Sequence, residues 1–157
     1  MLDKQQLYKF LVEAKKATYA AGKNAKKIIE DDNSTTLIYE NGDFKYHDNY
    51  FGGEPYGGRE VVFYKDTPVY IMAYYGNIIP TVLDFSPVYN ILQKALSSIP
   101  KDTPFRGPKE FKTDEYTYKN QFTGEINNFS GIETIEDNEG NEIYKAQYMG
   151  GYVDQRK

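Results

Sequence analysis

Residues 37–46 read LIYENGDFKY and contain the strongest signal for the fold. Apolar and aromatic residues alternate with polar ones on both sides of the dipeptide Asn41-Gly42, which is typical of the tight turn of a β-hairpin. We therefore predict two antiparallel strands joined by a type I′ turn. The same alternation predicts a second hairpin from residues 60–64 to residues 69–75, with its turn at residues 65–68.

Two amphipathic helices are expected around this first group of strands. In residues 3–21 apolar side chains recur with the spacing of one helix face, Asp3 suits the N-cap position, and Gly22 suits the C-terminal stop. The second helix is predicted over residues 86–96, with Ser86 as its N-cap. Further strands are predicted near residues 110–118, 125–129, 131–136 and 142–149.

The chain also contains an internal repeat. Tyr46-x3-Tyr50-x-Gly52 recurs as Tyr118-x3-Phe122-x-Gly124, and Tyr70-x3-Tyr74-x-Gly76 recurs as Tyr144-x3-Tyr148-x-Gly150. From this we predict an α+β fold in a single domain, residues 1–157, that consists of two pseudo-symmetric α-β-β-β-β repeats. The repeats would span residues 3–76 and 86–151, and one helix would cover the antiparallel sheet of each.

The repeat separates residues that serve the fold from residues that are specific to one half. Glu60 aligns with Glu133, and a role in folding is the simplest explanation for both. In contrast, the adjacent pair His47-Asp48 aligns with Lys119-Asn120, and Arg59 aligns with Ile132. Arg106 has no counterpart. We expect function among these unmatched residues.

Composition excludes several functional classes. The formal net charge of −4 and the pI of about 5.1 argue against sequence-independent nucleic-acid binding, which needs clustered basic residues. We interpret the one basic cluster as the solvated end of a helix; its members are Lys15, Lys16, Lys23, Lys26 and Lys27. The chain has no cysteine, one histidine and no apolar stretch long enough to span a membrane. These features predict a cytoplasmic protein with no metal or cofactor.

Residues 46–62, YHDNYFGGEPYGGREVV, resemble a bacterial domain family of unknown function. The tripeptide Arg106-Gly107-Pro108 and the closing residues 148–151 carry the same resemblance. The family includes small stand-alone proteins and the C-terminal halves of XRE-type helix-turn-helix regulators. This chain lacks the helix-turn-helix, so the resemblance implies an effector or sensor-like module without a DNA reader of its own.

A binding site for a small anionic ligand, such as a nucleotide, is the function that we predict. Glycine pairs let backbone N–H groups approach a ligand, arginines supply bidentate contacts to phosphate or carboxylate, and aromatic rings stack on planar groups. The predicted pocket lies between the two halves or between subunits. Its residues are His47, Asp48, Tyr50, Phe51, Gly52, Gly53, Tyr56, Gly58, Arg59, Glu60, Tyr74, Tyr75 and Arg106.

Two other functional classes stay open. The first is a protein-interaction or inhibitor module that uses exposed tyrosines as anchors, and a tyrosine-rich sheet edge would also favour a homodimer. The second, a weaker alternative, is a hydrolase that uses His47 and a pair of carboxylates such as Glu54 with Glu60 or Glu133. No Gly-x-Ser-x-Gly or Walker motif occurs, and we predict a non-catalytic protein.

Overall fold

Both predicted hairpins form, but their turns differ from the prediction. Asn41 pairs with Phe44, so the loop is Gly42-Asp43, and of these two residues only Gly42 has a positive φ, 59°. This pattern is typical of a type II′ turn, so the predicted type I′ turn is wrong. In the second hairpin Lys65 and Asp66 have φ values of 49° and 62°, which is the type I′ pattern.

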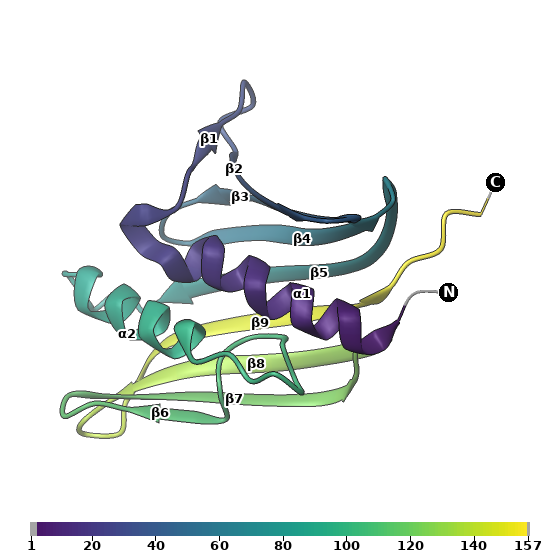
Figure 1. Ribbon diagram of the computed structural model, residues 1–157. Helices are drawn as coiled ribbons and strands as arrows, with labels where there is room; N and C mark the ends of the chain where they lie inside the picture. The colour runs from purple at the N-terminus through teal and green to yellow at the C-terminus, as the bar shows by residue number, and fades with distance from the viewer. Residues whose placement is uncertain (1–2, 157) are drawn as a thin grey trace.

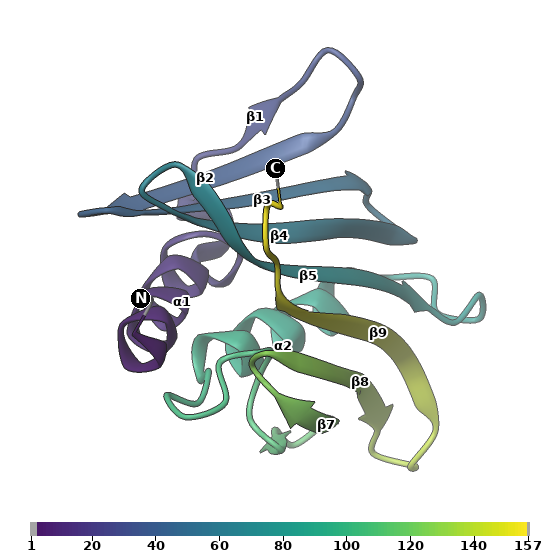
Figure 2. The same ribbon diagram turned by 90° about the vertical axis from the view of Figure 1, so that its right-hand side faces the viewer.

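The computed structural model describes residues 3–156 and contains one nine-stranded antiparallel sheet in the order β1-β2-β3-β4-β5-β9-β8-β7-β6 (Figure 1). Both α-helices lie on the same side of this curved sheet (Figure 2). The helices are α1 (Lys4–Ala17), the 3₁₀-helix η1 (Tyr19–Asn24) and α2 (Ser86–Ser97). The strands are β1 (Ile28–Ile29), β2 (Thr35–Asn41), β3 (Phe44–Gly52), β4 (Tyr56–Tyr64), β5 (Thr67–Ile78), β6 (Glu110–Lys112), β7 (Tyr116–Glu125), β8 (Asn128–Asp137) and β9 (Glu142–Tyr152).

The predicted architecture of two α-β-β-β-β repeats, each with its own helix-covered sheet, is wrong. Strands β5 and β9 pair from Tyr70↔Tyr152 to Ile78↔Tyr144 and join both parts of the chain into a single sheet. The part before α2 contributes five strands and the part after it contributes four. An isolated sheet would leave the hydrogen-bonding groups of β5 or β9 unpaired at an edge, and pairing the two strands satisfies both rows.

The helix ends also deviate from the prediction. Asp3 caps α1 as expected, because its carboxylate accepts a hydrogen bond of 3.0 Å from the backbone N–H of Gln5. However, α1 ends at Ala17, and Gly22 lies inside η1 with a φ of 59°. Helix α2 begins at Ser86, so the N-cap is Phe85 and not Ser86 as predicted.

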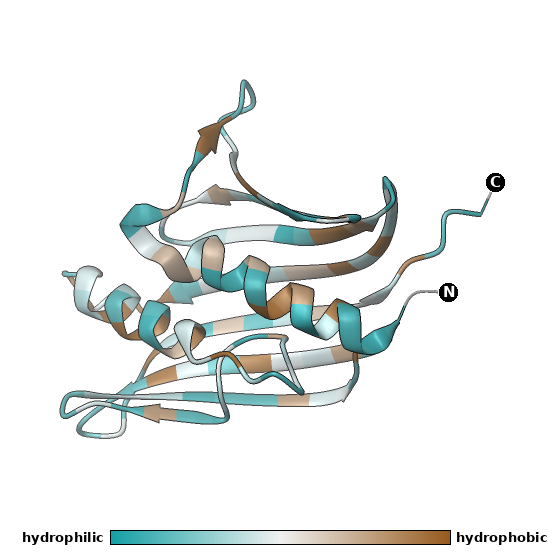
Figure 3. Ribbon diagram, in the orientation of Figure 1, coloured by the Kyte–Doolittle hydropathy of each residue, from teal (hydrophilic) through white to brown (hydrophobic). Residues whose placement is uncertain are grey.

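The hydrophobic core lies between the helices and the sheet. One cluster gathers below α1 around Leu7 and Leu11, and a second gathers below α2 around Leu92. Apolar segments of the helices alternate with hydrophilic ones along each ribbon (Figure 3). Between the two clusters, side chains from both helices and the sheet leave a hollow that contains polar groups.

Candidate ligand-binding cavity

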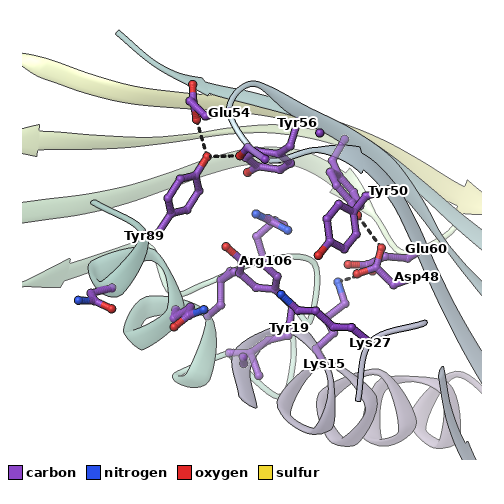
Figure 4. Close-up of a pocket in the computed structure, with 18 of the residues that line it drawn as sticks. Lys15, Tyr19, Lys27, Asp48, Tyr50, Glu54, Tyr56, Glu60, Tyr89 and Arg106 are labelled. Atoms are coloured by element: carbon purple, nitrogen blue, oxygen red, sulfur yellow. Dashed lines mark hydrogen bonds and ion pairs between the residues drawn. The ribbon is translucent and has the colours of Figure 1, made fainter. Parts of the chain in front are cut away.

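A cavity of about 830 Å³ lies between the helices and strands β3, β4 and β5 (Figure 4). This volume is within the range of small-molecule sites. Residues of α1, η1, α2 and the segment before β6 complete its wall. The cavity therefore depends on segments that are far apart in the sequence.

Eight of the thirteen predicted site residues line this cavity. Successive side chains of a strand point to opposite faces, so every second residue of β3, β4 and β5 faces the helices. The eight residues are Asp48, Tyr50, Gly52, Gly53, Tyr56, Glu60, Tyr74 and Arg106. The structure thus brings most of the predicted residues together around one cavity.

Four predicted residues lie on the opposite face of the sheet. By strand alternation His47 and Phe51 point away from the face that holds Asp48 and Tyr50. Arg59 and Tyr75 lie on that same outer face, and 58% of Tyr75 and 50% of Phe51 are exposed. His47 therefore cannot meet Asp48 or Glu60 inside the cavity.

Gly58, the remaining predicted residue, does not line the cavity although it lies on the helix-facing side. It pairs with Tyr50, and a Cβ atom added at Gly58 would lie 2.6 Å from Cβ of Tyr50 and 2.4 Å from the backbone oxygen of Asn49. The absence of a side chain at Gly58 lets strand β3 approach closely.

Two carboxyl groups lie side by side in the cavity wall. Asp48 on β3 and Glu60 on β4 are direct cross-strand neighbours, and they are 3% and 4% exposed. Tyr74 on β5 donates a hydrogen bond of 2.5 Å from its hydroxyl to Oδ1 of Asp48. Burial, together with the charge of Glu60, raises the pKa of Asp48 to about 7. Asp48 is therefore a carboxyl group that titrates near neutral pH.

Lys15 connects helix α1 to this acidic pair. Its Nζ lies 2.9 Å from Oε2 of Glu60 and donates a hydrogen bond of 2.5 Å to the backbone oxygen of Phe105. Burial lowers the pKa of Lys15, and the charge of Glu60 opposes this shift. The interpretation of the basic cluster as a solvated helix end is wrong for Lys15, which is 8% exposed.

Two further lysines of that cluster line the cavity. Lys23 lies in η1 and Lys27 follows it, and both are exposed at the cavity wall. Figure 4 shows the Lys27 side chain extending into the cavity. Within residues 3–156, neither ammonium group lies within ion-pairing distance of a carboxylate. These two positive charges are therefore available to a ligand.

Arg106 is present in the cavity wall, but its charge is already paired. Its Nε donates a hydrogen bond of 3.1 Å to Oε1 of Glu133, and its Nη2 contacts the same oxygen. Burial opposes the charge of Arg106, yet Glu133 outweighs it and raises the pKa of the guanidinium. The guanidinium carbon also lies 5.7 Å from the ring centre of Tyr74, a cation–π distance. Glu133 in turn accepts hydrogen bonds from Tyr118 and Tyr144.

A second polar connection joins the β3–β4 loop to α2. Tyr89 of α2 donates a hydrogen bond of 2.9 Å to the backbone oxygen of Gly53 and also contacts the carboxylate of Glu54. The other oxygen of Glu54 accepts a hydrogen bond of 2.5 Å from the backbone N–H of Ile78. These contacts hold the loop next to the cavity (Figure 4).

Residues 48–153 match the family described as a domain of unknown function, DUF5680. The chain belongs to the DUF5680 family. This match confirms the resemblance to a family of unknown function. No curated protein and no solved structure matches the chain. The DUF5680 match begins at Asp48 and includes β4, β5 and α2, whereas Lys15, Lys23 and Lys27 precede it.

Sequence reasoning missed several residues of this DUF5680 cavity. Lys15, Lys23 and Lys27 belong to a charge run of ordinary appearance, and nothing in their spacing distinguishes them from the neighbouring lysines. Tyr19 and Tyr89 fall within the two predicted helices, which explained them without a ligand.

Across residues 3–156, no cluster of three or more His, Cys, Asp or Glu residues is suited to a metal ion. Neither helix in that range has the length and apolar character needed to cross a membrane.

Proposed function

We propose that this protein is a non-catalytic binding module for a small anionic ligand of nucleotide-like character, acting as a sensor or as a sequestering protein. The observation that carries the proposal is the cavity of about 830 Å³ in which tyrosine rings and two unpaired lysines occur together. The rings belong to Tyr19, Tyr46, Tyr50, Tyr56, Tyr74 and Tyr89. Aromatic faces suit a planar base, and ammonium groups suit a phosphate.

The charges around the cavity support an anionic ligand at one end only. Lys15 and Arg106 are neutralised by Glu60 and Glu133. Lys23 and Lys27 lack such partners among the described residues, so an anionic group placed beside them would gain charge-assisted hydrogen bonds. We assign the anionic group of the ligand to this end of the cavity.

Native mass spectrometry of protein purified gently from a lysate tests the proposal, followed by denaturation to identify a released molecule. The double variant Lys23→Gln/Lys27→Gln should lose the bound molecule or bind it at least about tenfold more weakly, since a hydrogen bond to a charged group contributes about 1.5–3 kcal/mol. The double variant Lys16→Gln/Lys26→Gln is the matched control, because it removes the same charge from two exposed lysines of the same basic cluster that do not line the cavity. A clean apo mass that is unchanged by a nucleotide panel would overturn the proposal.

The wider setting of the module is also proposed from the sequence. The resemblance of residues 46–62 supports a bacterial protein whose relatives occur alone or attached to XRE-type regulators, and the composition supports a cytoplasmic location. In this setting the domain would report the level of its ligand to a partner. The direct measurement is the affinity of the purified protein for its partner in the presence and in the absence of the ligand.

Protein interaction is the second candidate, and the uncovered face of the sheet favours it. Large apolar side chains are exposed there, among them Phe51 at 50%, Tyr75 at 58% and Met149 at 65%. A homodimer through this face would bury them. Light scattering over a concentration series tests this candidate, and a Met149→Lys variant should shift the protein towards the monomer. A monomeric wild-type protein at all concentrations would exclude the homodimer.

A further inference from the structure

The carboxyl group of Asp48 has a hydrogen-bond partner on only one of its two oxygens. Tyr74 donates to Oδ1, whereas Oδ2 receives no hydrogen bond from any of residues 3–156. Oδ2 is not among the fully buried polar atoms that lack a hydrogen-bond partner in residues 3–156, so it keeps surface that is accessible from the cavity that Asp48 lines. A donor group of a ligand in the cavity can therefore reach this free oxygen.

Asn120 provides an internal comparison for this arrangement. It is the cross-strand neighbour of Glu133, as Asp48 is of Glu60, and its Oδ1 accepts a hydrogen bond of 2.6 Å from Tyr148. Tyr148 is in turn the direct β-sheet partner of Tyr74. The second polar atom of Asn120, Nδ2, donates a hydrogen bond of 3.0 Å to the backbone oxygen of Gly107.

The two sites differ in what occupies the space beside the second polar atom. Beside Asn120 the backbone of the segment before β6 lies against the side chain and satisfies it. Beside Asp48 the corresponding space belongs to the cavity. At Asn120 the protein supplies a hydrogen-bond acceptor for the amide nitrogen. At Asp48 the free oxygen needs a hydrogen-bond donor, and a ligand in the cavity would supply it.

The carboxylate of Asp48, next to a wall lined by tyrosines, favours a planar ligand ring whose edge carries N–H donors. Each carboxylate oxygen has two acceptor positions, so Asp48 can keep its bond to Tyr74 and still accept two N–H groups. Two adjacent donors, a ring N–H and an exocyclic amino group, form such an edge in guanine. N–H donors would also stabilise the ionised form of Asp48 against burial, which disfavours it.

We propose that Asp48 is the specificity residue of the cavity and that the ligand is a nucleotide with a guanine-type donor edge, held with its phosphate towards Lys23 and Lys27. This inference rests on the proposed binding function and names its ligand class. It predicts that a base with an oxygen in place of the amino group is rejected, since two acceptors would then face each other.

Isothermal titration calorimetry with guanosine, xanthosine and adenosine 5′-monophosphates tests the inference. The wild-type protein should bind the guanosine nucleotide at least about tenfold more tightly than the other two, in line with the discrimination from one bidentate contact. The isosteric variant Asp48→Asn should reverse the order of the guanosine and xanthosine nucleotides, because its amide can donate to the oxygen of xanthine. Asp43→Asn, an exposed turn residue outside the cavity, is the control and should keep the wild-type order.

The outcomes separate the inference from the function on which it rests. Binding of the nucleotides without preference, or a preference that Asp48→Asn leaves unchanged, would overturn the role of Asp48 and leave the binding module intact. If none of the three nucleotides binds to a wild-type protein with a native circular dichroism spectrum, the nucleotide-like ligand class itself is wrong. A thermal melt of Asp48→Asn confirms that the comparison uses folded protein.

Discussion

Lys15 of helix α1 and Glu60 of strand β4 form an ion pair of 2.9 Å with side chains that are 9% and 5% exposed. This pair anchors the helix to the sheet next to the cavity. A buried ion pair contributes little net stability compared with an apolar pair, but the loss of one partner leaves an uncompensated charge. The pair therefore affects the stability of the fold as well as the charge of the cavity.

Removal of Lys15 alone should destabilise the protein strongly. We expect Lys15→Met to lower the free energy of unfolding by about 3–5 kcal/mol, because Glu60 would keep a buried charge without a partner. The double variant Lys15→Met/Glu60→Gln should recover a large part of this loss. Urea denaturation of the three proteins measures both values. Equal stability of the wild type and Lys15→Met would show that the pair is solvated in solution.

Asp48 should make the stability of the protein fall as the pH rises. Its pKa in the folded protein is about 7 and its ordinary value is 3.8, so the folded state holds more protons than the unfolded state between these values. The stabilising contribution is complete below about pH 4 and is lost as the pH rises through about 7. Each pKa unit corresponds to about 1.4 kcal/mol. We expect Asp48→Asn to be the more stable protein at about pH 8, by an amount on the order of a few kcal/mol.

Urea denaturation of the wild type and Asp48→Asn across this pH range measures the difference directly. The two stability curves should converge towards acidic pH, where Asp48 is protonated and resembles the amide. Parallel curves would contradict the raised pKa.

Tyrosines of the cavity wall should contribute to ligand binding, and tyrosines of the outer face should not. Tyr50→Ala removes a ring from the cavity and should weaken binding of a nucleotide about tenfold, since stacking on one aromatic ring contributes about 1–3 kcal/mol. Tyr75→Ala is the matched control, because Tyr75 is 58% exposed on the opposite face. Equal losses in the two variants would indicate a general effect on the fold. Titration calorimetry with the released ligand provides the measurement.

Gly58 should be intolerant of a side chain although it does not line the cavity. An added Cβ would lie 2.4 Å from the backbone oxygen of Asn49, so Gly58→Ala must push β3 away from β4. We expect a loss of about 1–3 kcal/mol, which is typical of an overpacked site. Gly53→Ala has open space around the new methyl group and should melt within a few degrees of the wild type. A thermal melt of both variants decides between these outcomes.

Much of the candidate site was accessible from the sequence because strand alternation is a local property. The alternating pattern around Tyr46 and Tyr50 places Asp48 on their face and His47 on the opposite face, although we predicted both as site residues. Arg59 was predicted as a ligand contact for its charge and its glycine neighbours. The register of β3, β4 and β5 instead places it with the exposed outer residues. The type of residue therefore gave a wrong site assignment for Arg59, which the alternation of side chains along the strand would have corrected.

The lysines of α1 show what sequence reasoning could not predict. Lys15 and Lys16 are adjacent and chemically identical, yet Lys15 is buried beside Glu60 and Lys16 is exposed. The difference depends on which side of α1 meets the sheet and on the position of β4 below it. Neither fact can be derived from the charges of the helix alone.

By itself, the sequence determined the two hairpins and the two helices, because turn chemistry and side-chain periodicity act over a few residues. Only the tertiary structure decided that β5 pairs with β9 to make one sheet, and that both helices cover the same face. Those contacts join segments more than 60 residues apart, as in Ile78↔Tyr144, and backbone hydrogen bonds between strands carry no information about side-chain type. The cavity with Asp48, Lys15 and Lys27 is likewise a product of tertiary structure, because its wall combines β3, β4 and β5 with α1, η1, α2 and the segment before β6.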